Sequence, residues 1–126
     1  CCLSIEKEIG FHKFNYNKPL NTPWLSGCFM FCRVTCFSSV GLFDERFFMY
    51  LEDLDLSRRF HKKHKTMFYP KAQIIHGYRS GWKSNKSLFI NLLSSTIKYF
   101  SKYGWIFDSD RAKINKAFKN RVNTTR

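Results

Sequence analysis

Apolar residues recur every three or four positions between Lys86 and Tyr103, and this spacing predicts an amphipathic helix over that range. The apolar positions are Leu88, Phe89, Leu92, Leu93, Ile97, Phe100 and Tyr103. The other face is formed by Asn91, Ser94, Ser95, Lys98, Ser101 and Lys102. Gly104 follows as a stop signal. Two interpretations stay open: the stripe packs on the chain's own domain, or the basic helix lies on an anionic membrane surface.

Five of the nine carboxylates lie within residues 44–55, in a chain of formal net charge +13. Like charges packed this closely repel one another and cost stability unless cations or chemistry compensate. The run Glu52-Asp53-Leu54-Asp55 is therefore the first candidate for a functional site. The same run predicts the start of a helix that continues to about His64, because acids at its start and bases towards its end both complement the helix dipole.

The basic residues concentrate in the second part of the chain. Residues 57–126 hold seventeen of the 22 Lys and Arg but only two of the nine acids, and the pI is near 9.8. This balance with interleaved aromatics is typical of nucleic-acid-binding proteins, and a basic nucleic-acid-binding module is the alternative function. Against it, no known nucleic-acid module is legible, and the most ordered motif is acidic and would repel phosphates.

Shorter segments give weaker predictions. Trp24–Arg33 has the apolar and aromatic character of a buried strand, and Val34–Val40 suits a short helix ended by Gly41. Thr66–Tyr69 and Gln73–His76 are short β-prone runs. The chain is expected to form one domain of the α/β class.

Two patterns in the sequence resemble sets of metal ligands, one of cysteines and one of histidines. Cys28, Cys32 and Cys36 recur every four positions, but Phe and Met stand between them where a metal site needs turn residues, so we interpret the run as apolar core. His61 and His64 are interpreted as the solvated end of a helix. Five cysteines without a disulfide-scaffold pattern favour reduced thiols.

Four ordered blocks carry a family resemblance. They are Trp24-Leu25-Ser26-Gly27-Cys28-Phe29-Met30, Val40-Gly41-Leu42-Phe43-Asp44-Glu45, residues 47–59 with the acidic run, and Tyr69–His76. Over residues 22–105 the series resembles the C-terminal half of the family 2 inverting glycosyltransferases, which have a GT-A fold. Within that family it is most similar to the rhamnosyltransferases of bacterial polysaccharide and O-antigen assembly.

The resemblance implies site residues. It makes Asp53 the general base that takes the proton of the acceptor hydroxyl. It makes Glu52 and Asp55 candidates for binding acceptor hydroxyls, although Asp55 is equally suited to an ion pair with Arg58 or Arg59. Trp24 and Gly27 fall at the family's pocket-lining segment. His76 matches a position that in some members binds the divalent cation, Mg²⁺ or Mn²⁺.

The resemblance also implies partners and an architecture. Residues 1–85 correspond to the acceptor-side part of a transferase domain with a mixed sheet and flanking helices, and residues 86–126 to an amphipathic helix and a basic tail. The nucleotide-binding βαβ units and their Asp-x-Asp metal motif are not legible, and Asp108-Ser109-Asp110 is expected to form a turn or helix cap. We therefore expect a fragment, inactive alone, of an enzyme that moves a sugar, rhamnose by the resemblance, from a nucleotide-sugar donor. The expected acceptor is a polyprenyl-diphosphate-linked saccharide at the cytoplasmic face of the plasma membrane.

Overall fold

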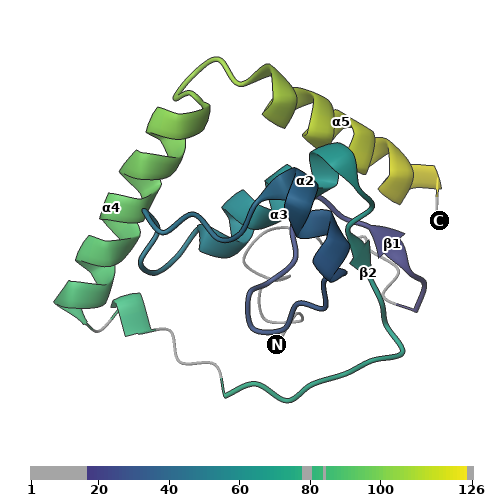
Figure 1. The fold of residues 1–126 in the computed structure, drawn as a ribbon, viewed down its shortest axis with the longest axis horizontal. Coiled ribbons are helices and arrows are strands. Elements are labelled where there is room, and N and C mark those ends of the chain that lie inside the picture. Colours follow the sequence, from purple (N-terminus) through teal and green to yellow (C-terminus); the bar gives the residue numbers. More distant parts are fainter. Residues whose placement is uncertain (1–16, 78–80, 84, 125–126) are drawn as a thin grey trace.

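The computed structural model describes residues 17–77, 81–83 and 85–124, and it combines α-helices with a small β-sheet (Figure 1). The order of elements is β1 Leu20–Asn21, the 3₁₀ turn η1 Val34–Cys36, α2 Phe37–Val40, α3 Glu52–Lys63, β2 Met67–Phe68, the 3₁₀ turn η2 Gly81–Lys83, α4 Lys86–Tyr103 and α5 Ser109–Thr124. The mixed α and β character was expected. The sheet is smaller than expected, because only two strands form within the described residues.

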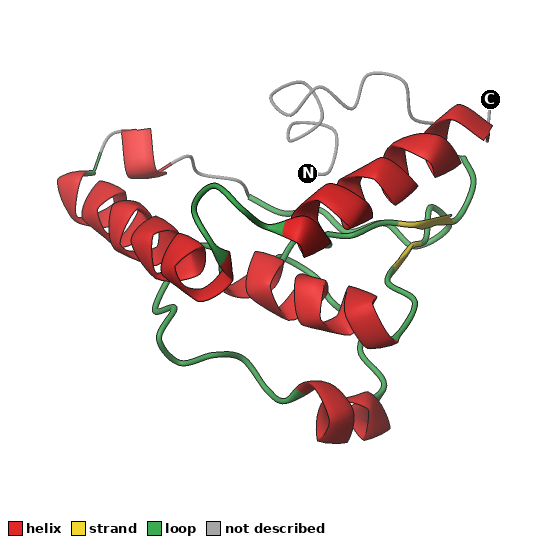
Figure 2. Cartoon of the chain, turned by 90° about the horizontal axis from the view of Figure 1, so that it is seen from above, coloured by secondary structure: helices red, strands yellow, loops and turns green. Residues whose placement is uncertain are grey.

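Helix α3 is the centre of the arrangement, with α4 and α5 flanking it (Figures 1 and 2). Leu56 and Phe60 on α3 are buried, and the remaining buried apolar side chains come from other elements. These are Leu20, Phe47, Tyr99 and Phe118. The core therefore surrounds the helix that carries the acidic run.

The local sequence of α3 explains its limits. Glu52, Asp53 and Asp55 occupy its first turn and His61, Lys62 and Lys63 its last, so charges complement the dipole at both ends. The helix begins after Tyr50 and Leu51, which both have left-handed φ angles of 67° and 65°. It ends where His64 turns to an extended conformation, in agreement with the sequence prediction.

The sheet differs from the prediction in two places. Strand β2 lies within the predicted Thr66–Tyr69 run and pairs antiparallel with β1, Leu20 opposite Phe68. The predictions of strands at Trp24–Arg33 and Gln73–His76 were wrong, because both segments are loops. A strand needs a partner, and the backbone of residues 24–27 is bound instead by side chains of α3.

Two further helical predictions were confirmed. Residues 34–40 form η1 and α2, which end at Gly41 with a φ of 80°. Helix α4 begins after Asn85, whose side chain accepts hydrogen bonds from the backbone N–H of Ser87 and Leu88, and it ends at Gly104. Helix α5 was not predicted, since the sequence read there only as a basic tail. The division between residues 85 and 86 stays a prediction, and residues 1–16 lie outside the described part.

The orientation of α4 matches the first of the two interpretations only in part. Ser95 and Tyr99 are its buried residues, whereas Phe89, Ile90, Leu93 and Ile97 are about half exposed or more. The other members of the predicted stripe are half-buried, namely Leu88, Leu92, Phe100 and Tyr103. Ser95 donates a hydrogen bond to the backbone oxygen of Met49 at 2.7 Å, so part of the predicted polar face points inward. Among the described helices, none is both long and apolar enough to span a membrane.

Candidate active site

Asp53 lies in the first turn of α3, and both of its carboxylate oxygens are held by backbone N–H groups. Oδ2 accepts from Gly27 N at 2.8 Å and Oδ1 accepts from Leu54 N at 2.7 Å. A carboxylate offers roughly four acceptor positions, so two such bonds fix its orientation and leave capacity for a ligand hydroxyl. The side chain is only partly buried. This combination of a fixed orientation and access suits a general base.

The loop opposite Asp53 is fastened to α3 at two points. The Ser57 hydroxyl accepts from Leu25 N at 3.1 Å and donates to Leu25 O at 3.3 Å, one helical turn after Asp53. Gly27 then approaches Asp53 so closely that a Cβ at residue 27 would lie 3.1 Å from the Asp53 Cβ. The two sequence-predicted residues Gly27 and Asp53 therefore meet in space.

Glu52 precedes Asp53 in the chain, and Trp24 lies three residues before Gly27. Each of the two side chains has a buried polar atom. Within the described residues, Glu52 Oε2 and Trp24 Nε1 have no hydrogen-bond partner. Burial raises the pKa of Glu52 above its usual range, and the neighbouring Asp53 carboxylate adds to the increase. A buried acceptor next to Asp53 in the sequence and a buried donor three residues before Gly27 both lack a partner, and each could bind a hydroxyl group if the loop opened.

Asp55 has a different environment from Asp53. It is fully buried, and Arg59 Nε binds its Oδ2 at 2.8 Å, while Lys102 Nζ and Tyr103 OH bind its Oδ1 at 2.6 Å each. The ion pair with Arg59, considered from the sequence, is present. The alternative role of Asp55 in acceptor binding stays a prediction, and it would require some of these bonds to open.

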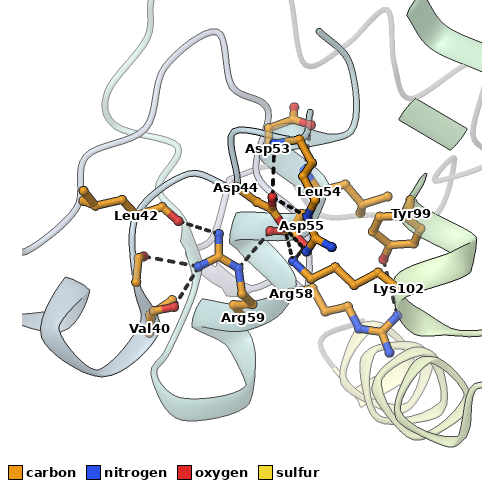
Figure 3. Close-up of polar contacts among 12 residues, drawn as sticks. Val40, Leu42, Asp44, Asp53, Leu54, Asp55, Arg58, Arg59, Tyr99 and Lys102 are labelled. Atoms are coloured by element: carbon orange, nitrogen blue, oxygen red, sulfur yellow. Dashed lines mark hydrogen bonds and ion pairs between the residues drawn. The ribbon is translucent and has the colours of Figure 1, made fainter. Parts of the chain in front are cut away.

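Arg59 connects the acidic run to the loop before it. Its guanidinium group binds Asp55 and also donates to the backbone oxygens of Val40 at 2.7 Å, Gly41 at 3.2 Å and Leu42 at 2.7 Å (Figure 3). Lys102 reaches the same cluster from α4 and bridges Asp55 and Asp44 (Figure 3). These cations compensate the repulsion that the crowded carboxylates imply.

Arg58 joins α3 to the start of α5. Its NH1 and NH2 groups bind the two oxygens of Asp108 at 2.6 Å each, and both side chains are buried. Asp108 also accepts from Arg111 N at 2.9 Å, which makes it the cap of α5 and confirms the capping prediction for this second Asp-x-Asp string. The hydrogen bonds from Arg58 lower the pKa of Asp108 to about 2.

His76 lies in a segment, residues 71–77, that is exposed and runs along the outside of the fold (Figure 1). Within the described part of the chain, no three His, Cys, Asp or Glu side chains are grouped closely enough to hold a metal ion. The described residues alone therefore do not fit a divalent cation, and His76 could supply one ligand at most.

The cysteine run is less buried than predicted. Cys28, Cys32 and Cys36 are free thiols of intermediate exposure, and Phe29 and Phe31 between them are exposed. The interpretation of this run as apolar core was therefore wrong. The loop turns to meet α3 at Gly27, and the side chains that follow point away from the core.

Sequence reasoning missed Ser57, Lys102 and Tyr103. All three hold the acidic helix in place, but Ser57 and Lys102 looked like ordinary surface positions, and Tyr103 was counted with the apolar stripe of its helix. The one available signal was the acidic cluster itself, since buried carboxylates require cations or hydroxyl donors from elsewhere in the chain.

Comparisons with known proteins place this geometry in context. The chain is similar to an N-acetylglucosaminyl-diphospho-decaprenol L-rhamnosyltransferase of Mycobacterium tuberculosis, with 44% identity over 54 residues. That match covers 42% of this chain and 18% of the relative. The chain is also similar to the rhamnosyltransferase WbbL of Escherichia coli, with 29% identity over 99 residues, 75% of this chain and 37% of the relative.

Both relatives are rhamnosyltransferases. They support the resemblance seen in the sequence at the level of a rhamnosyltransferase-like glycosyltransferase. The chain spans less than half of the length of either relative. No family model matches the chain, and no solved structure matches it.

Proposed function

We propose that this chain is the acceptor-side part of a family 2 inverting glycosyltransferase with a GT-A fold, which transfers rhamnose to a lipid-linked saccharide. The observation that carries the proposal is the carboxylate of Asp53, held by Gly27 N and Leu54 N and still accessible. The names of the two relatives supply the sugar and, from the mycobacterial one, the class of acceptor, a saccharide on a polyprenyl diphosphate.

In the proposed reaction Asp53 accepts the proton of an acceptor hydroxyl as its oxygen attacks the anomeric carbon of the donor sugar. The bond from that carbon to the diphosphate breaks on the opposite side, and the nucleoside diphosphate leaves with the electron pair. A single displacement of this kind inverts the anomeric configuration. Trp24 Nε1 and Glu52 Oε2 are proposed to bind other hydroxyls of the acceptor, because each is a buried polar atom without a partner within the described residues.

The donor site is proposed to lie outside these 126 residues, since the chain spans 37% of the E. coli relative. A divalent cation, Mg²⁺ or Mn²⁺, belongs to the proposal only as a helper of the donor diphosphate. His76 would supply one ligand, and the other ligands would come from the diphosphate and from protein outside the described part. The enzyme would work at the cytoplasmic face of the membrane, where its lipid-linked acceptor is anchored.

The test is sugar transfer by the full-length protein that contains this chain, measured with radiolabelled nucleotide-rhamnose and a lipid-linked acceptor. Asp53→Asn should lower the transfer rate by roughly 10²–10⁴ while the protein stays folded and binds the donor. Asp110→Asn is the matched control, because Asp110 is a partly exposed carboxylate that pairs with Lys62 near the end of α3, whereas Asp53 lies in the first turn of that helix. Near-normal transfer by Asp53→Asn would exclude Asp53 as the base, and no transfer by the unaltered protein from any nucleotide-rhamnose would contradict the proposed function.

A further inference from the structure

The apolar side of α4 is not covered by the rest of the described chain. Phe89, Ile90, Leu93 and Ile97 follow one another along this side at helical spacing, and each is about half exposed or more. The opposite side is fixed to the body of the protein by polar bonds, from Ser95 to Met49 O and from Lys102 to Asp55. These bonds prevent the helix from rotating to bury its apolar side.

The loop that follows α4 carries further exposed apolar side chains. Trp105, Ile106 and Phe107 are 57%, 79% and 93% exposed. The loop begins at Gly104, whose φ is 100° and where a Cβ would lie 2.7 Å from the Phe107 backbone oxygen. It is fixed at its other end by the Arg58–Asp108 pair, and the Trp105 ring stacks on Phe100 with centroids 5.3 Å apart. The three apolar side chains are thus held outward by a defined backbone.

Positive charge adjoins this apolar surface. Lys113, Lys116 and Lys119 are exposed on α5, and Lys86 and Lys98 are exposed on α4. From residue 57 onward the chain has only two acids; Asp108 is buried against Arg58, and Asp110 is paired with Lys62. Both acids in this part of the chain are therefore compensated.

We propose that these side chains, which we call the apolar ridge (Phe89, Ile90, Leu93, Ile97, Trp105, Ile106 and Phe107), insert into the interface of an anionic lipid bilayer. Apolar insertion beside exposed lysines matches both parts of such a surface, the acyl boundary and the anionic headgroups. A second copy of the chain matches only the apolar part, because its own net charge of +13 repels. The proposal rests on the exposed ridge and its charge, independently of the proposed enzymatic function.

The other exposed apolar side chains do not share this surface. They lie within residues 29–48, next to Asp44 and Glu45, and within residues 67–75, and nothing in the structure indicates what covers them. The ridge is distinguished from them by its lysines and by its rigid attachment to α3.

The attachment of α4 to α3 also fixes the height of Asp53 above a bilayer to which α4 is bound, because Asp55, two residues from Asp53, binds Lys102 and Tyr103 of α4. This consequence rests on the proposed function.

The experiment is co-sedimentation of the 126-residue chain with vesicles of phosphatidylcholine and phosphatidylglycerol, compared with vesicles of phosphatidylcholine alone. Binding should require the anionic lipid and weaken as salt rises. The double variant Ile106→Ser, Phe107→Ser should lower the partition coefficient by about tenfold or more, and Ile90→Ser should lower it independently. Lys113→Gln with Lys116→Gln should lower it by about tenfold at low salt.

The matched control is Ile75→Ser, because Ile75 is fully exposed, lies in the loop between β2 and η2 outside the ridge, and should change binding by less than about twofold. All altered side chains are exposed, so the far-ultraviolet circular dichroism spectrum should not change.

Three results would overturn the proposal. One is no binding to anionic vesicles at low salt. Another is binding that the ridge variants leave unchanged, which would mean that charge alone attracts the chain to the vesicles. Binding to DNA without a preference for vesicles would lead to the same conclusion. The third is self-association in sedimentation equilibrium that the ridge variants abolish in the absence of lipid, which would identify a second copy as the partner.

Discussion

Asp53 and Asp55 are two residues apart in α3, and their surroundings separate their roles. Asp53 is bound only by backbone N–H groups and stays accessible, whereas Asp55 is fully buried among Arg59, Lys102 and Tyr103. Burial raises the pKa of Tyr103 above its usual range, and the bond to Asp55 adds to this, so the phenol remains a proton donor to the carboxylate. One carboxylate is thus available for chemistry, and the other holds two helices together.

Gly27→Ala tests the contact that orients Asp53. The added methyl group would lie 3.1 Å from the Asp53 Cβ, so the loop or the carboxylate must shift by a few tenths of an ångström. We expect transfer by the full-length enzyme to fall by roughly tenfold with little change in the free energy of unfolding. Comparison of kcat with the urea midpoint checks this, with Gly77→Ala as control, because a Cβ at Gly77 meets nothing within 4 Å. Equal activity of the two variants would show that the approach of Gly27 does not position Asp53.

Arg59→Ala tests whether the loop before the acidic run depends on one guanidinium group. The substitution removes charge-assisted bonds to Val40 O and Leu42 O and one of the cations that compensate buried Asp55. We expect the free energy of unfolding to fall by roughly 2–3 kcal/mol, measured by urea denaturation. Arg59→Lys should recover only part of this loss, because an ammonium group cannot reproduce the fork of donors. Full recovery by lysine would contradict the argument from geometry.

At the scale of elements, α5 is held to α3 chiefly at its first turn. The Arg58–Asp108 pair is buried, the Arg58 guanidinium lies 4.0 Å from the centre of the Tyr103 ring, and Asp108 caps α5. Most of the rest of α5 is polar and exposed, apart from Phe118, which is buried. The docking of this helix therefore depends on the ionisation of one carboxylate.

The stabilisation from Asp108 should depend on pH. Because its pKa is about 2 in the folded chain and 3.8 ordinarily, its contribution is fully present above the higher value and is lost as pH falls through the lower one. Asp108→Asn should lower the free energy of unfolding by about 3 kcal/mol at neutral pH, since it leaves a buried guanidinium without its charge partner. The difference from the unaltered chain should shrink as the pH is lowered towards about 2. A difference independent of pH, measured by urea denaturation across this range, would exclude the ion pair as its cause.

At the scale of the whole molecule, a small apolar core is combined with a large excess of positive charge. Within the part of the chain that the structure describes, six apolar side chains are buried, while bulky residues such as Phe31 and Val34 are largely exposed. From residue 57 onward the chain holds seventeen cations and only two acids, so the excess cations repel one another across α3, α4 and α5. Ion pairs inside the fold are shielded from salt, whereas the repulsion between exposed lysines is not.

Moderate salt should therefore stabilise the isolated chain. We expect the free energy of unfolding to rise by about 1 kcal/mol between low salt and about 0.15 M sodium chloride, because screening relieves the repulsion more than it weakens the buried pairs. Lys113→Gln with Lys116→Gln removes two of the repelling charges, so this variant should gain less from salt. A stability that falls with salt would mean that attractive surface pairs outweigh the repulsion.

Local physics made several features predictable from the sequence. Helix α4 has the predicted limits because its periodicity and the stop at Gly104 are properties of adjacent residues, and the same holds for the charges and ends of α3. The family resemblance named Gly27 and Asp53 each as a site residue, but their contact was not predicted, because the two lie 26 positions apart in the sequence. The strands predicted at Trp24–Arg33 and Gln73–His76 failed, since a strand exists only where a second strand offers its backbone.

The sequence alone determined where α3 and α4 begin and end and where the carboxylates crowd together. Only the tertiary structure decided which side of α4 faces inward. An apolar stripe by itself favours burial, but the buried carboxylate of Asp55 requires donors, and Lys102 and Tyr103 supply them only if the side of α4 that carries both residues packs against α3. Leaving that buried charge without partners would cost several kcal/mol, so α4 keeps this orientation and the apolar ridge remains at the surface.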